Sequence, residues 1–195
     1  MIQRILLIIF SLLVILLFYF NHSETVTFIT ISDPGYYISQ DRKNILICPR
    51  GFYCPTANLT EPQACVKGYF CPNEGQTRQY KCPYGKYCPE NGLEYPENCP
   101  VGFYCPEFGL IYPKTCEKGF FCPKLNTVNL EICPIGTYCP YGSIEPKKCP
   151  IGYYCPQTFI AVPYKCGQGK YCPEEGMKNE MDCPEGKKCV NGIIV

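Results

Sequence analysis

Apolar residues are distributed in two different ways along the chain. Residues 5–20 are almost entirely apolar, interrupted by the polar Ser11, and Arg4 precedes them. Such a run is slightly short for a membrane span of about 20 residues and slightly long for the core of a signal peptide. After residue 20 the apolar positions show no 3.6-residue period, so we expect no further helix. The pattern predicts one N-terminal helix within residues 1–22 and a helix-free remainder.

This N-terminal segment has two interpretations. A cleaved signal peptide needs small residues before the cut, and the sequence after the run, Asn21-His22-Ser23, is poor in them. An uncleaved signal anchor needs no such site, and Arg4 would keep the amino terminus in the cytoplasm. We therefore predict a single-pass type II membrane protein held by residues 5–20, or a secreted protein if the segment is cleaved. Either interpretation places residues 24–195 in an oxidising compartment, at the cell surface or in the secretory pathway.

Cysteine follows a strict register from residue 48 onward. Successive first cysteines are 17 residues apart, with a single step of 16, and a second cysteine follows each of them six residues later. Residues 48–195 therefore hold nine units of the form C-x5-C, which we number 1 to 9. The units begin at Cys48, Cys65, Cys82, Cys99, Cys116, Cys133, Cys149, Cys166 and Cys183. Such internal repetition is typical of linear repeat arrays.

Each unit reads approximately C-P-x-G-x-Y-C-P, and the recurring residues have physical roles. Proline followed two residues later by glycine fits a type I turn with the glycine at its fourth corner. The aromatic residue before the second cysteine fits a short strand, and the proline after that cysteine ends it. A unit of 17 residues cannot bury a core of its own. We therefore predict a small disulfide-rich array in which short β-hairpins and turns stack linearly into a rod, each aromatic packing on a neighbouring disulfide.

The number of units restricts how the 18 cysteines pair. Bonds from each unit to the next would leave Cys48 and Cys189 unpaired, and exchange between pairs of units would leave one unit over. Closure within each unit leaves no cysteine over, so we favour it. The predicted disulfides are Cys48–Cys54, Cys65–Cys71, Cys82–Cys88, Cys99–Cys105, Cys116–Cys122, Cys133–Cys139, Cys149–Cys155, Cys166–Cys172 and Cys183–Cys189.

A similar segment without cysteine precedes unit 1. The stretch SDPGYYI at 32–38 matches CPRGFYC at 48–54, with Ser32 and Ile38 in place of the two cysteines. The step from Ser32 to Cys48 is 16 residues, a spacing that the array already contains. Loss of both cysteines together is what a bond within one unit predicts. We therefore expect a degenerate repeat at 32–47, inside a joining segment at 23–47.

Composition argues against several kinds of chemistry. The formal net charge is +1, which gives no indication of a nucleic-acid partner. Structural zinc sites use closer cysteine pairs and often histidine, whereas the spacing here is uniform and the single histidine is His22. Redox catalysis would require C-x-x-C, and the acidic residues occupy variable positions. We expect no metal, no cofactor and no enzymatic activity.

Two features suggest surface contacts or modification. Asn58-Leu59-Thr60 is a sequon for N-glycosylation. The position two residues before the second cysteine alternates between aromatic residues and lysine, so we expect it to face outward and to contact a protein or a glycan. Its aromatic members are Phe52, Tyr69, Phe103, Phe120 and Tyr153. The competing interpretation is that the aromatic residues fill the small core between units.

The phrase C-P-x-G-x-Y-C-P resembles the ephrin-receptor-like cysteine-rich repeats, which are similar in style to the cysteine-rich modules of growth-factor and tumour-necrosis-factor receptors. The resemblance covers residues 48–195. It implies a protein of the cell surface or a secreted protein, without enzymatic activity. The chain departs from the usual animal pattern, which interleaves C-x-x-C elements, because only C-x5-C occurs here.

The sequence thus predicts a membrane-anchored, extracellular, lumenal or virion-surface structural protein that acts as a coat, spacer or assembly component. Protein partners or self-association are expected. The alternative is a receptor-like or adhesin-like module that binds a protein or glycan through outward aromatic residues.

Overall fold

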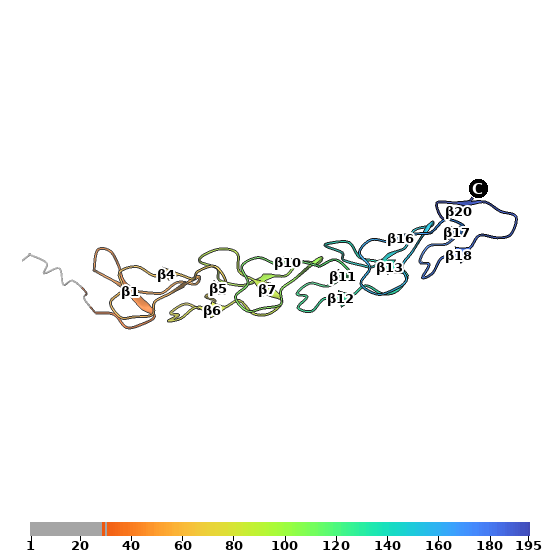
Figure 1. Ribbon diagram of the computed structural model, residues 1–195. Coiled ribbons are helices and arrows are strands. Elements are labelled where there is room, and N and C mark those ends of the chain that lie inside the picture. Colours follow the sequence, from red (N-terminus) through yellow and green to blue (C-terminus); the bar gives the residue numbers. More distant parts are fainter. Residues whose placement is uncertain (1–28, 30) are drawn as a thin grey trace, which may run out of the picture.

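The computed structural model of the chain describes residues 29 and 31–195, and the predicted N-terminal helix lies outside them. These described residues form a row of ten antiparallel two-stranded hairpins that make an elongated array (Figure 1). Within them no helix is long and apolar enough to cross a membrane. The strands are β1 (Tyr36–Ile38), β2 (Ile45–Ile47), β3 (Phe52–Tyr53), β4 (Gln63–Ala64), β5 (Tyr69–Phe70), β6 (Tyr80–Lys81), β7 (Lys86–Tyr87), β8 (Glu97–Asn98), β9 (Phe103–Tyr104), β10 (Lys114–Thr115), β11 (Phe120–Phe121), β12 (Glu131–Ile132), β13 (Thr137–Tyr138), β14 (Lys147–Lys148), β15 (Tyr153–Tyr154), β16 (Tyr164–Lys165), β17 (Lys170–Tyr171), β18 (Met181–Asp182), β19 (Cys189–Val190) and β20 (Ile193–Ile194).

Units 1 to 8 each contain one hairpin. In unit 1 the first strand, β3, is the aromatic pair before the second cysteine, and the second strand, β4, immediately precedes the first cysteine of unit 2. Phe52 pairs with Ala64, and Tyr53 pairs with Gln63. The predicted array of short hairpins is confirmed, and the strand positions explain why the aromatic pair and the spacing to the next cysteine recur together.

The tight turn at the start of each unit differs from the prediction. In unit 1 the Phe52 N–H donates to the Pro49 carbonyl at 3.2 Å, so the turn begins one residue later than predicted. Gly51 is therefore at its third corner, where it has a φ of 79°. A positive φ at that corner is the mark of a type II turn, which strongly favours glycine. The type I prediction was wrong because it placed glycine at the fourth corner.

A first pair of backbone hydrogen bonds joins each of units 1 to 7 to the next unit through this glycine. Gly51 donates its N–H to the Cys71 carbonyl at 2.8 Å and accepts the Cys65 N–H at 3.0 Å. Cys65 and Cys71 are the two cysteines of unit 2, so one glycine holds both ends of the neighbouring disulfide loop. The same two bonds form at Gly35, Gly68, Gly85, Gly102, Gly119, Gly136 and Gly152.

A second pair of bonds comes from a turn that follows the second cysteine. In unit 2 this turn lies at Gly75-Gln76. Gly75 donates its N–H to the Cys48 carbonyl at 2.8 Å, and the Gln76 carbonyl accepts the Cys54 N–H at 2.8 Å. Four backbone hydrogen bonds therefore connect units 1 and 2, and the same arrangement recurs along the array.

These bonds satisfy all the backbone polar groups of the disulfide pairs of units 1 to 7. Cys65 and Cys71 bond to Gly51 of the unit before them. The Cys65 carbonyl accepts from Gly92 at 2.7 Å, and the Cys71 N–H donates to the Leu93 carbonyl at 2.9 Å. Both cysteines have no exposed surface. Buried backbone N–H and C=O groups require partners, and here the partners are supplied by the two neighbouring units.

The line of cystines forms the core of the array. The cysteines of units 1 to 7 have no exposed surface. Tyr138, from unit 6, packs against Cys149, Cys155 and Ile160 of unit 7. The aromatic residue before the second cysteine thus covers the next disulfide at this junction, as predicted from the sequence.

Contacts also reach two units along the array. A methyl group placed on Gly51 would lie 2.3 Å from the carbonyl oxygen of Gly92, in unit 3. Gly68 and Gly109 stand in the same relation, with a corresponding distance of 2.6 Å. The array is therefore held together beyond its nearest neighbours, and this contact adds a steric reason for glycine to the reason from φ.

The turn after the second cysteine has a positive φ at one position in each of units 1 to 8. The residue with positive φ is glycine or asparagine in seven of these units, including Gly142 (φ 75°) in unit 6, and it is Phe159 (φ 64°) in unit 7. Gly142 follows its cysteine by three residues rather than four, which locates the missing residue of the 16-residue step in this turn. Phe159 tolerates a conformation that is unfavourable for a large residue, and its ring packs edge-on against Phe120 with centroids 5.1 Å apart.

Successive hairpins point in different directions around the long axis. In Figure 1, β4, β10 and β16 lie along one edge of the array, and β6, β12 and β18 lie along the opposite edge. These strands belong to units 1, 4 and 7 and to units 2, 5 and 8, respectively. Every third unit thus returns to the same side.

Replacing Gly51 by alanine tests the contact between units 1 and 3. Gly169 is the matched control because it has a similar φ of 74° and no atom within 4 Å of the added methyl group. We expect Gly169→Ala to cost about 1 to 2 kcal/mol from the backbone conformation alone. Gly51→Ala should cost on the order of 3 kcal/mol or more, because the methyl group also meets a carbonyl. Thermal unfolding of the two variants measures the difference, and equal losses would contradict the contact.

Candidate interaction surface

The structure joins the two cysteines of each unit. The bonds are Cys48–Cys54, Cys65–Cys71, Cys82–Cys88, Cys99–Cys105, Cys116–Cys122, Cys133–Cys139, Cys149–Cys155, Cys166–Cys172 and Cys183–Cys189. All 18 cysteines lie in the described part of the chain and none of them is a free thiol. Each bond closes a small loop, so the connections between units are non-covalent apart from the chain itself.

The cysteine-free segment 32–47 occupies the place of a further unit before unit 1. Ser32 and Ile38 are 3% and 4% exposed, close to the burial of the cysteines that they replace. The Ile38 N–H donates to the Leu59 carbonyl at 2.7 Å, and the Ser32 carbonyl accepts the Asn58 N–H at 3.2 Å. These are the same two bonds that a disulfide loop makes with the following unit.

Ser32 and Asn58 form two reciprocal hydrogen bonds at the position of the missing disulfide. The Ser32 N–H donates to Asn58 Oδ1 at 2.8 Å, and the Asn58 N–H donates to Ser32 Oγ at 3.1 Å. Asn58 is exposed and has a φ of 62°. The side-chain nitrogen of Asn58, Nδ2, is the atom that N-glycosylation modifies, and it takes part in neither bond. Glycosylation of Asn58 stays a prediction.

The five aromatic residues that were expected to face outward are all half-buried. They are Phe52, Tyr69, Phe103, Phe120 and Tyr153. Each lies at the start of a first strand, inside the disulfide loop. The aromatic residues that directly follow them, before the second cysteine, are half-buried as well. The structure therefore does not separate an inner from an outer aromatic position. Their role in contacts stays a prediction.

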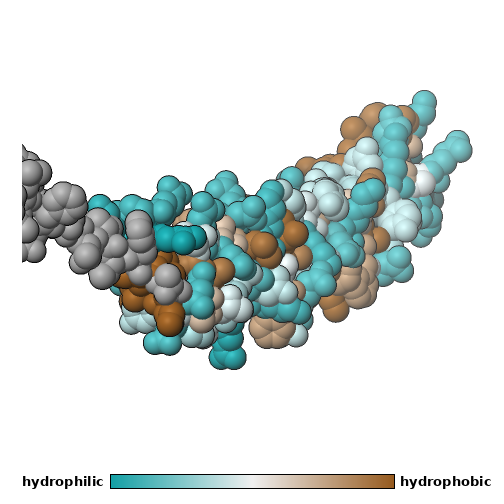
Figure 2. Space-filling view, turned by 90° about the vertical axis from the view of Figure 1, so that its left-hand side faces the viewer, coloured by the Kyte–Doolittle hydropathy of each residue, from teal (hydrophilic) through white to brown (hydrophobic). Residues whose placement is uncertain are grey.

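More exposed apolar side chains lie at other positions. One is the variable residue before the conserved glycine, where Tyr84 is 52% exposed and Ile151 is 53% exposed. Another is the turn after the second cysteine, where Phe108 is 55% exposed. The sequence analysis missed these positions because charged residues occupy them in other units. Over the face in Figure 2, apolar side chains form separate patches among polar ones.

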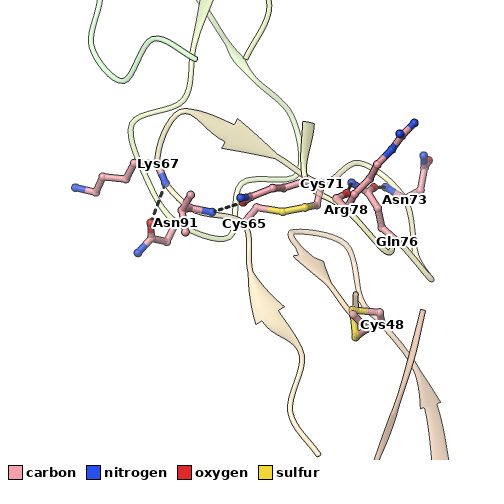
Figure 3. The surroundings of a disulfide bond; sticks show 11 residues. Cys48, Cys65, Lys67, Cys71, Asn73, Gln76, Arg78 and Asn91 are labelled. Atoms are coloured by element: carbon pink, nitrogen blue, oxygen red, sulfur yellow. Dashed lines mark hydrogen bonds between the residues drawn. A yellow bond between two sulfur atoms is a disulfide. The ribbon is translucent and has the colours of Figure 1, made fainter. Parts of the chain in front are cut away.

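These two exposed positions lie side by side across a unit junction. In unit 2 the Lys67 N–H donates to Asn91 Oδ1 of unit 3 at 3.0 Å (Figure 3). Tyr84 of unit 3 and Phe108 of unit 4 have the same relation, and their ring centroids are 4.2 Å apart. An exposed aromatic pair of this kind offers a flat apolar surface to a partner.

Two tyrosines of the first strands bond to carboxylates. Tyr104 donates its hydroxyl to Glu117 Oε1 of unit 5 at 2.9 Å. Burial and this bond raise the pKa of Tyr104 above its ordinary value. A hydrogen bond with Glu97, together with burial, raises the pKa of Tyr87. Both hydroxyls therefore stay protonated as donors at neutral pH and stabilise the fold until the solution is alkaline enough to ionise them.

The described residues contain no group of three or more His, Cys, Asp or Glu side chains placed to hold a metal ion. An open hollow beside the last disulfide is lined by Lys165, Lys187 and Lys188, among others. Nothing in its lining is a buried charged group, so it has the character of a solvated basic surface.

A tenth disulfide tests whether the segment 32–47 is a true unit of the array. The double variant Ser32→Cys with Ile38→Cys should oxidise within the segment, because its backbone has the hydrogen bonds of a disulfide loop. We expect about 2 kcal/mol of stabilisation of this end, since the closed loop is small. Alkylation and mass spectrometry of the native variant should find no free thiol. Two alkylated cysteines in the folded variant would contradict the assignment.

Comparison with known proteins adds no family assignment. No model of a known protein family matches this chain, and a search of curated proteins finds no relative. The resemblance to ephrin-receptor-like repeats therefore stays a prediction from the motif, and what the structure shows is a disulfide-rich array of short antiparallel hairpins.

Proposed function

We propose that this protein is a non-enzymatic structural rod that acts as a spacer, coat or assembly component. The observation that carries the proposal is the continuous ladder of backbone hydrogen bonds through consecutive disulfide loops. The hydrogen bonds of this ladder are made by backbone groups at positions that recur from unit to unit. The side chains at the other positions are therefore free to differ between units. Its product is an extended shape rather than one specific site.

The arrangement of bonds supports a stiff rod. Four backbone hydrogen bonds cross each junction from unit 1 to unit 8, and the recurring glycine of one unit lies against the turn two units further on. Bending at a junction would lengthen bonds on one side and press backbone atoms together on the other. Repeat arrays with mainly local contacts gain stability from each added junction, so the rod is a suitable device for holding two points apart.

The location of the rod is also part of the proposal. The apolar run at residues 5–20 would anchor the amino-terminal end in a membrane, with the rod on the extracellular or lumenal side or on a virion surface. The nine disulfides support an oxidising compartment, because disulfides of this density are typical of secreted and surface proteins.

Shortening the rod by a whole turn tests the spacer role. Deletion of 99–148 removes units 4, 5 and 6 and joins two ends that occupy equivalent places in the repeat. In cells, a fluorescent tag at the carboxyl end should stand closer to the labelled membrane by about 30% of its original height, because stacked repeats contribute length additively. Disulfide mapping of the deleted protein checks that it folds. An unchanged height in a folded protein would contradict the spacer role.

A binding module is the second candidate, and the exposed pair of Tyr84 and Phe108 favours it. Aromatic faces bind apolar partner surfaces and the faces of sugar rings. The partner in this case would be a protein or a glycan, as the receptor-like or adhesin-like alternative expects.

Screening the full chain on a glycan array tests this candidate. We expect binding to be lost in the double variant Tyr84→Ala with Phe108→Ala, because both exposed rings are removed. The matched control is Tyr112→Ala with Tyr141→Ala, which removes two exposed rings (63% and 62%) at other positions of the array. Equal loss in both variants would indicate damage to the fold, and absence of any glycan binding would remove this candidate for glycans.

A further inference from the structure

The nine units fall into three sets of three, which the spacing of cysteines alone does not reveal. Units 1, 3, 4, 6 and 7 have proline both after the first cysteine and three residues before the next unit. Units 2, 5 and 8 have proline at neither position. Their residues there are Val66 and Gln79, Glu117 and Leu130, and Gly167 and Glu180. The chain therefore repeats with a longer period of three units, which is 51 residues from Cys48 to Cys99 and 50 residues from Cys99 to Cys149.

In units 2 and 8 the two positions are in contact. In unit 2 the Val66 N–H donates to Gln79 Oε1 at 3.0 Å. In unit 8 the Gly167 N–H donates to Glu180 Oε2 at 2.8 Å. Proline has no N–H to donate, so a unit with proline at the first position has no use for an acceptor at the second. In units 2 and 8 the longer period is thus accompanied by a backbone-to-side-chain hydrogen bond that a unit with proline cannot form.

The same period is the period of the rod. Units 2, 5 and 8 carry β6, β12 and β18, which lie along one edge of the array in Figure 1. We call the surface formed by these three units the proline-free face. The sequence therefore distinguishes one side of the rod from the others over units 1 to 8.

Charge changes sign along the proline-free face. Unit 2 has three cations (Lys67, Arg78, Lys81) and one anion (Glu74), which gives a net charge of +2. Unit 5 has two of each and is neutral (Lys118, Lys124, Glu117, Glu131). Unit 8 has two cations (Lys170, Lys178) and four anions (Glu174, Glu175, Glu180, Asp182), which gives a net charge of −2. The face is basic at one end, neutral in the middle and acidic at the other end.

The last residue of each second strand shows the same order at a single structural position. It is Lys81 in unit 2, Ile132 in unit 5 and Asp182 in unit 8. All three are exposed, Ile132 by 51% and the Asp182 side chain by 88%. An apolar residue thus lies midway between opposite charges that are each one turn of the rod away.

We propose that two copies of this chain associate side by side in antiparallel orientation through the proline-free face. A two-fold axis at Ile132 brings the two isoleucines together and places Lys81 of each copy opposite Asp182 of the other. Such an interface uses the same surface on both copies, as two-fold symmetric dimers do. The proposal deepens the role as an assembly component and rests on that proposed function for the stiffness of the rod.

A second copy fits this face better than an unrelated partner for a geometric reason. Only a partner with the same axial repeat can meet units 2, 5 and 8 in turn, and another copy has that repeat by construction. Reversal of direction is required by charge, because parallel copies in register would place unit 2 against unit 2 and unit 8 against unit 8. Like charges directly opposite one another are unfavourable.

The ion pair already present in unit 8 is compatible with this arrangement. Lys170 and Asp182 lie 2.5 Å apart within one hairpin. The pair is solvent-exposed, so it contributes little by itself. A carboxylate accepts more than one hydrogen bond, and Asp182 therefore retains acceptor sites for a lysine of the second copy.

Sedimentation velocity of the full chain in a mild detergent, over a range of concentrations, tests the proposal. We expect a monomer–dimer equilibrium that weakens at high salt. Ile132→Lys should weaken dimerisation at least 10-fold, because two lysines would then meet at the axis. Tyr164→Lys is the matched control, since Tyr164 is 48% exposed and lies in β16, on the opposite edge of the array in Figure 1. It should leave the dissociation constant within about 2-fold of the original.

A charge exchange identifies the partner residues. Asp182→Lys should weaken dimerisation by roughly 10-fold, because the substitution acts twice in a symmetric dimer. Combining it with Lys81→Asp should restore the original dissociation constant, because the opposite charges then meet again in exchanged places. The loss of the contact with Lys170 is common to both variants and cannot explain a recovery.

Three outcomes would overturn the proposal: a monomer at every concentration, equal effects of the substitutions at Ile132 and Tyr164, or no recovery in the double variant. None of these outcomes bears on the height of the carboxyl-terminal tag above the membrane. Failure of the pairing is therefore distinguishable from failure of the spacer role.

Discussion

The structure depends on the need to pair the backbone polar groups of a buried cystine. The N–H and C=O groups of the two cysteines have no hydrogen-bond partner inside their own disulfide loop, yet the cysteines of units 1 to 7 have no exposed surface. The unit before supplies a glycine, and the unit after supplies a turn. Because a unit is complete only between two neighbours, the natural product is an array. The regular spacing of cysteine, glycine and turn follows from this requirement.

Much of this architecture was predictable because it is encoded within a single unit. Cysteine spacing and parity pointed to closure within the unit, and the aromatic pair indicated a short strand. The glycine before the aromatic pair was recognised, but its turn was misassigned, because the choice between adjacent corners depends on which carbonyl the Phe52 N–H reaches. The positive φ of Phe159 could not be predicted from its own unit. The ring of Phe120, which packs against Phe159 and offsets this unfavourable conformation, belongs to a different unit.

The surface was harder to predict than the core. Which side chains face the same way depends on the rotation from one unit to the next, and no single unit contains that information. Three similar phrases, at 48–54, 99–105 and 149–155, were visible in the sequence, but their meaning as one side of a rod required the structure. The half-buried state of Phe52 and Phe103 has the same origin, since neighbouring units determine how much of each ring remains accessible.

The closure of every disulfide within its own unit has a mechanical consequence. A pulling force along the rod would pass through the sulfur–sulfur bonds and leave the five residues inside each loop unstretched. Only the ten residues between one loop and the next, or nine at the short step, could lengthen as a junction opens. The rod would therefore yield in small, separate steps, and each released segment could return to its place without any covalent bond having been broken.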